Sequence, residues 1–99
     1  MIVVAKSMGT LAAADAAEHA WPGIWLTPLL EDAEAVVALR RRTAPALLIG
    51  GTEDPMWNGR IAREITDDVL ELEGADHGLA KAKHLQQIAD AVAAFAARG

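Results

Sequence analysis

The stretch that decides the fold is IVVAKSMG, residues 2–9. Its first half, residues 2–5, is an apolar, mostly β-branched run that is too short for a helix. It also lacks polar residues, which is typical of a strand buried inside a parallel sheet. The segment 9–20 that follows is rich in alanine, the residue with the highest helix propensity. The stretch therefore predicts a strand, a tight connection and a helix.

The same alternation continues along the chain. Short apolar runs at residues 24–26, 46–49 and 69–73 predict three further strands, and the last of these alternates in polarity as an edge strand does. Residues 31–42 predict a helix with acids in its first turn and arginines in its last, and residues 58–65 predict a short one. The C-terminal segment predicts an amphipathic helix from the helical spacing of Leu85, Ile88, Val92 and Phe95.

Strands separated by helices pair in parallel through right-handed crossovers. We therefore predict a single α/β domain over residues 1–99, with a parallel sheet of about four strands and intervening helices. In such sheets the functional residues gather at the carboxyl ends of the strands. Candidate residues are therefore sought in the loops that follow the strands.

Composition narrows the classes of function. The net charge is −5, and the basic residues cluster only at positions 40–42, so we expect no nucleic-acid partner. The chain has no cysteine, and residues 2–5 are too short for a signal peptide or a membrane span. We expect a cytoplasmic protein without a membrane partner. The sequence has no metal-binding or dinucleotide motif, so no metal and no cofactor are predicted.

Ser7 lies in the loop after the first strand, within Ala5-Lys6-Ser7-Met8-Gly9. This is close to the G-x-S-x-G turn that holds a nucleophilic serine above a sheet, with alanine in place of the first glycine. The N–H of Met8 would then face a developing oxyanion. Two other interpretations are a serine that caps the following helix and a phosphate-binding loop, for which the required glycines are missing.

Acids and a histidine follow the third and fourth strands. Asp54 is the preferred carboxylate to orient a histidine, with Glu53 as the fallback and a turn or helix cap before Pro55 as the structural alternative. His77, in Gly74-Ala75-Asp76-His77-Gly78, is the candidate general base. His19 and His84 are expected to be solvated. The chain order serine, acid, histidine is that of α/β-hydrolases among the common triad folds.

The chain resembles the second half of the α/β-hydrolase fold, in its small, lidless branch related to dienelactone hydrolase. The motifs that carry the resemblance are Val3-Val4-Ala5-Lys6-Ser7-Met8-Gly9, Leu26-Thr27-Pro28-Leu29-Leu30, Gly51-Thr52-Glu53-Asp54-Pro55 and Gly74-Ala75-Asp76-His77-Gly78. The resemblance implies that the four strands match the family's fifth to eighth and that no large cap domain is present. The family's first half, which supplies a second oxyanion donor, has no counterpart in the sequence.

These patterns favour a serine hydrolase of ester or thioester-like bonds, with Ser7, Asp54 and His77 as the triad and an acyl-enzyme on Ser7. Thr27, Met56, Trp57 and Leu79 are the candidate substrate-binding residues, although Trp57 fits a core or interface position slightly better. The alternative is a truncated, non-catalytic fragment that serves in assembly or binding. In either case the strand at residues 2–5 would be an unpaired apolar edge. We expect it to pair with a second copy of the chain or with a missing N-terminal half.

Overall fold

The computed structural model describes residues 2–7, 12–79 and 81–98. Its centre is an all-parallel sheet in the order β1-β2-β3-β4, so strands that are consecutive in the sequence are neighbours in space. The strands are β1 (Val3–Lys6), β2 (Gly23–Leu26), β3 (Ala46–Gly51) and β4 (Val69–Leu72). The predicted α/β fold with about four parallel strands is confirmed.

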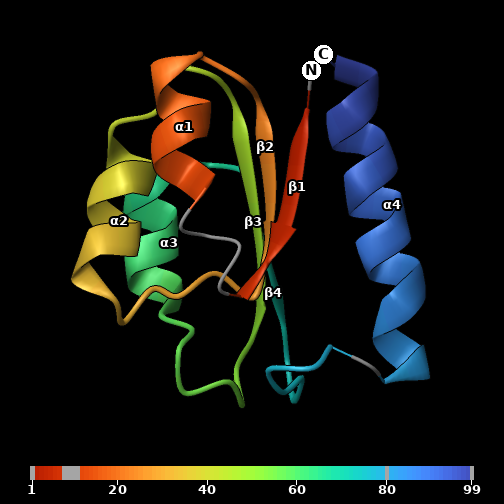
Figure 1. Cartoon of the computed structure of the whole chain (residues 1–99). Coiled ribbons are helices and arrows are strands. Elements are labelled where there is room, and N and C mark those ends of the chain that lie inside the picture. The colour runs from red at the N-terminus through yellow and green to blue at the C-terminus, as the bar shows by residue number, and fades with distance from the viewer. Residues whose placement is uncertain (1, 8–11, 80, 99) are drawn as a thin grey trace.

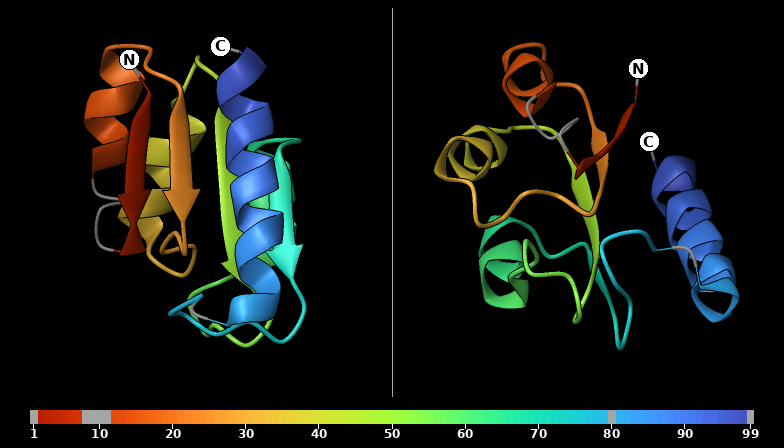
Figure 2. Two further views of the ribbon diagram at one scale, coloured as in Figure 1. Left: turned by 90° about the vertical axis from the view of Figure 1, so that its right-hand side faces the viewer. Right: turned by 60° about the horizontal axis from the view of Figure 1, so that its bottom comes forward.

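The helices cover the two faces of the sheet unequally. They are α1 (Ala13–Glu18), α2 (Ala33–Arg40), α3 (Gly59–Ile65) and α4 (Ala82–Arg98). The first three pack on one face, and α4 alone lies on the other (Figure 1). Figure 2 shows α4 lying in front of β3, so that β1 has no helix over it on that side. The protein is therefore a three-layer sandwich with one incomplete layer.

Apart from the start of the first helix, element boundaries agree with the sequence prediction to within two residues, and capping side chains explain two of the helix starts. Helix α2 begins after Asp32, whose side chain caps it by accepting a hydrogen bond from Ala35 N–H. Asn58 caps α3 in the same way by accepting from Ile61 N–H. The predicted start of the first helix at Gly9 lies outside the described residues.

Strand β3 is the centre of the core. All six of its residues are buried, and its two faces belong to different apolar clusters. One cluster, toward α1, α2 and α3, contains Trp25, Leu48 and Trp57. The other, toward α4, contains Ile49 and Phe95. Burial on both faces explains why this strand reads as a continuous apolar run in the sequence.

Two glycines at the end of β3 are required by close packing. A Cβ atom on Gly50 would lie 2.0 Å from the Trp57 ring, and one on Gly51 would lie 2.1 Å from the Ala75 carbonyl oxygen. No side chain fits at either position. The glycine pair therefore allows the segments that follow β3 and β4 to fold tightly over the carboxyl end of the sheet.

Both outer strands are sheet edges, as predicted, but they differ in cover. Strand β4 pairs with β3 and is flanked by α3 and α4. Strand β1 pairs with β2 along one side only, and Val4 on it is 61% exposed. Within the described residues, no helix combines the length and the apolar character needed to cross a membrane.

Candidate active site

Ser7 directly follows β1 and has a positive φ of 53°. A residue other than glycine rarely adopts this left-handed backbone conformation, and such residues concentrate at functional sites. The described residues include three other non-glycine cases, Ala20, Thr27 and Leu79. Two of these, Thr27 and Leu79, belong to the loops after β2 and β4, at the carboxyl end of the sheet, where Ser7 also lies.

His77 lies in the loop after β4 and reaches the serine across the sheet. Its Nε2 atom is 2.6 Å from Ser7 Oγ, although the two residues are 70 positions apart in the sequence. The His77 side chain is 43% exposed. It therefore contacts the serine on one side while remaining accessible to solvent and to a bound molecule.

Asp54 completes the hydrogen-bonded path. Its Oδ2 atom is 2.6 Å from His77 Nδ1, and its side chain is fully buried. Its other oxygen, Oδ1, accepts a hydrogen bond from Met56 N–H at 2.9 Å. The Asp54 side chain thus contacts His77 with one oxygen and closes the turn before α3 with the other. The interpretation as a partner of the histidine and the interpretation as a turn residue are therefore compatible. Glu53, the fallback, is exposed.

The protons in this path follow from its partners. An ionised carboxylate only accepts hydrogen bonds, so beside such a group a neutral histidine ring carries its proton on the nearer nitrogen, here Nδ1 of His77. Its Nε2 atom is then a free acceptor for the Ser7 hydroxyl proton. This arrangement is the one required of a general base that faces a nucleophile.

The loop that carries His77 is held at several points. Two lysines donate to its backbone carbonyls: Lys6 Nζ to Gly78 O at 2.9 Å and Lys81 Nζ to Gly74 O at 2.6 Å. Asp76 Oδ1 accepts from Gly78 N–H. Lys6 is the residue before Ser7, so its contact joins the serine loop to the histidine loop. The sequence pattern gave no sign of this role.

The residues proposed to bind substrate occupy different environments. Thr27 is fully buried, and its hydroxyl lies 3.0 Å from Ser7 Oγ. Leu79 is also buried, whereas Met56 is half-buried and accepts a backbone hydrogen bond from Leu30 N–H. Met8, the predicted oxyanion donor, lies outside the described residues.

Trp57 belongs to the core, which agrees with the slightly favoured interpretation of its sequence position. Its indole N–H donates to Glu71 Oε2 at 2.7 Å. This bond, together with Arg63, lowers the pKa of Glu71 from its usual value of 4.5 against the opposing effect of burial. Trp57 thus fixes the segment after Asp54 to β4.

His84 corrects a prediction made from the sequence. It was expected to be solvated, but it is 4% exposed and its Nε2 atom lies 3.2 Å from the Glu73 carbonyl oxygen. Near the start of α4, it ties this helix to Glu73, the first residue of the loop after β4. His19 is exposed, as expected, and stacks on Trp21.

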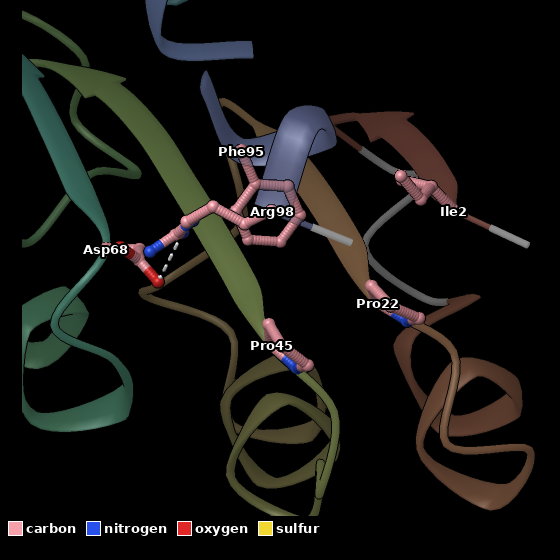
Figure 3. A pocket seen from close by; sticks show the side chains of 6 residues that line it. All are labelled: Ile2, Pro22, Pro45, Asp68, Phe95 and Arg98. Atoms are coloured by element: carbon pink, nitrogen blue, oxygen red, sulfur yellow. Dashed lines mark ion pairs between the residues drawn. The ribbon is translucent and has the colours of Figure 1, made fainter. Parts of the chain in front are cut away.

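A cavity of about 200 Å³ lies at the other end of the sheet (Figure 3). Its walls come from the residues that precede the strands and from the end of α4: Ile2, Pro22, Pro45, Asp68, Phe95 and Arg98. An ion pair between Arg98 and Asp68, 2.9 Å apart, closes one side. Because the strands are parallel, this cavity is separated from Ser7 and His77 by the length of the sheet.

Comparison with known proteins gives no relative: no protein-family model matches the chain, and no curated protein and no solved structure matches it significantly. Among the residues that the structure describes, no group of three or more histidine and acidic side chains is arranged to hold a metal ion.

Proposed function

We propose that the chain is a serine hydrolase that cleaves ester or thioester-like bonds. The observation that carries the proposal is the unbroken path from Ser7 Oγ to His77 Nε2 and from His77 Nδ1 to Asp54 Oδ2, with 2.6 Å at each step. Three loops from separate strands supply its members. Such convergence of a nucleophile, a base and an orienting carboxylate supports acyl transfer.

In the proposed reaction, Ser7 Oγ attacks the acyl carbon of the substrate while its proton passes to His77 Nε2. Asp54 stabilises the imidazolium that forms. The tetrahedral intermediate then expels the alcohol or thiol, which takes the proton from His77 Nε2, and leaves an acyl group on Ser7. Water then attacks the acyl carbon while His77 Nε2 takes its proton, and that proton passes to Ser7 Oγ as the acid is released. Met8 N–H is the proposed oxyanion donor.

A fluorophosphonate probe tests this proposal without knowledge of the substrate. We expect the protein to be labelled at Ser7, as located by mass spectrometry of its peptides. Labelling should be abolished in Ser7→Ala and reduced at least a thousandfold in His77→Ala. His19→Ala is the matched control, because His19 is exposed and its ring contacts, with the Asp15 carbonyl oxygen and Trp21, are local. A folded protein that is not labelled would refute the proposal.

The second candidate function is a non-catalytic fragment that serves in assembly or binding. The observation that favours it is strand β1, which has one unpaired side, an exposed Val4 and no helix over one face. We propose that this edge pairs with a second copy of the chain or with a polypeptide that supplies the N-terminal half of the fold. Exposed apolar edge strands readily add a strand from another chain.

The molar mass in solution distinguishes pairing with a second copy of the chain from pairing with a different polypeptide. We expect light scattering over a concentration series to give a mass that rises above that of the monomer, and Val4→Lys to return it to the monomer. The lysine fits at this position because Val4 is already exposed. A monomer mass at every concentration would refute self-association and leave only a different chain as the partner.

A further inference from the structure

Thr27 makes a contact that the proposed triad does not explain. It directly follows β2, is fully buried, and places its hydroxyl oxygen 3.0 Å from Ser7 Oγ. Its backbone has a φ of 47°, an unusual value for a β-branched residue. Such strain persists only where the surrounding structure enforces it. Two strained residues from neighbouring loops therefore meet through their hydroxyl groups.

The direction of this hydrogen bond follows from the proton positions in the site. Ser7 has one hydroxyl proton, and with the ring proton of His77 on Nδ1, the Nε2 atom 2.6 Å away is its acceptor. Ser7 Oγ therefore has only lone pairs to offer Thr27, and the Thr27 hydroxyl is the donor. We infer that Thr27 is a catalytic hydrogen-bond donor to the nucleophile, an inference that rests on the proposed hydrolase function.

The donated bond acts on an atom whose charge changes during the reaction. As the Ser7 proton passes to His77, negative charge grows on Ser7 Oγ, and a hydrogen bond to a charged acceptor is stronger than one to a neutral acceptor. The same charge returns when the acyl group leaves Ser7 in the second half of the reaction. A donor already aimed at this oxygen stabilises both steps without reorganisation.

The surroundings of Thr27 make the donor rigid and dry. Its own N–H donates to the Ile49 carbonyl oxygen at 2.7 Å, which fixes the backbone to β3. Pro28 follows and is also buried. Burial keeps water from substituting for the hydroxyl and strengthens the bond. The position therefore suits contact with the nucleophile better than contact with a substrate, the role predicted from its sequence position.

The test measures the rate of fluorophosphonate labelling at Ser7 in three variants. Thr27→Val keeps the shape and removes the donor, and Thr27→Ala removes the donor together with the β-branch. Both should label roughly ten- to a hundredfold more slowly than the wild type. Thr27→Ser restores the donor and should label within about threefold of the wild-type rate. Thr43→Val, at an exposed threonine, is the matched control and should not change the rate.

Circular dichroism and thermal unfolding establish that each variant is folded, and Thr27→Ala decides the outcome if the valine variant is not. If the wild type is labelled and Thr27→Val and Thr27→Ala are labelled at the same rate, the role of Thr27 is overturned, but the hydrolase proposal is not. A serine variant as slow as the valine variant would also overturn it, because the hydroxyl would not be the cause. An unlabelled wild type would instead overturn the hydrolase proposal and this inference together.

Discussion

The two ends of the sheet are built from the same strands but differ in chemistry. At the carboxyl ends, a buried carboxylate, a half-exposed histidine and a strained serine form one hydrogen-bonded path. At the amino ends, two prolines, Phe95 and a surface ion pair surround an apolar cavity. A carboxylate is fully buried at the first end, whereas both members of the ion pair at the second end are partly exposed.

The residues with a positive φ also differ in role between the two ends of the sheet. At the amino end, the positive φ of Ala20 belongs to the C-terminal cap of α1, where Trp21 N–H bonds to Ala16 O and Ala20 N–H to Ala17 O. Helices commonly end in this way, so the conformation has a structural purpose. Ser7 and Thr27 end no helix, and their strain brings two hydroxyl groups together. The same backbone conformation thus has different meanings at the two ends.

The largest effect is expected from Asp54→Asn. Asparagine still offers an oxygen to Met56 N–H, so the turn and the fold should remain. However, its amide group can donate to His77 Nδ1 and favour the tautomer that carries a proton on Nε2. We expect the Ser7 labelling rate to fall by about a thousandfold to ten-thousandfold at unchanged thermal stability.

Glu53→Gln is the control for this variant because Glu53 is the neighbouring, exposed acid. Its labelling rate should equal that of the wild type. A large loss in Glu53→Gln with little change in Asp54→Asn would assign the orienting role to Glu53 instead of Asp54. That result would contradict the geometry at the carboxyl end.

At the amino end, Phe95→Ala should change stability and not reactivity. The Phe95 ring is buried in the cluster beneath α4, and Arg98 lies over it at 5.2 Å. We expect the free energy of unfolding to fall by about 3–4 kcal/mol, measured by urea titration. The folded fraction should label at Ser7 at the wild-type rate. Slow labelling in urea-free buffer by a fully folded variant would show that the two ends are coupled.

The sequence predicted the carboxyl end better than the amino end. Strand and loop patterns identified Ser7, Asp54 and His77, because parallel strands bring the loops that follow them to one edge. The contact between Thr27 and Ser7 and the hydrogen bond from Lys6 Nζ to the Gly78 carbonyl oxygen depend on the direction of side chains. The periodicity of the sequence carries no information about that direction. The burial of His84 was missed for the same reason, and the cavity is formed by residues distant in the sequence.

Glu71→Gln tests the support beneath the carboxyl end. Trp57 and Arg63 donate to Glu71 and lower its pKa, so the charged form stabilises the fold. This contribution is present above the usual pKa of 4.5 and is lost as the pH falls through the lowered pKa of the folded state. We expect the variant to be less stable by about 1 kcal/mol at pH 7, because the carboxylate is partly exposed.

The measurement is the free energy of unfolding of both proteins between pH 7 and pH 3. The difference between them should shrink as the pH falls below 4.5. A difference that stays constant across this range would mean that the carboxylate charge does not contribute. The Ser7 labelling rate at pH 7 should be similar in the two proteins, because Glu71 bonds to Trp57 and Arg63, which are not members of the triad path.

The smallest effect is expected from Ala20→Gly, which tests the strained residue at the amino end of the sheet. The left-handed conformation costs an alanine roughly 1–2 kcal/mol, whereas glycine adopts it freely but loses more entropy on folding. We therefore expect a net gain of about 0.5–1 kcal/mol in the free energy of unfolding, seen as a higher melting temperature. The Ser7 labelling rate should not change, because Ala20 lies at the far end of the sheet. A loss of stability would mean that the alanine side chain contributes more than its strain costs, and the conformation at this helix end would then need another explanation.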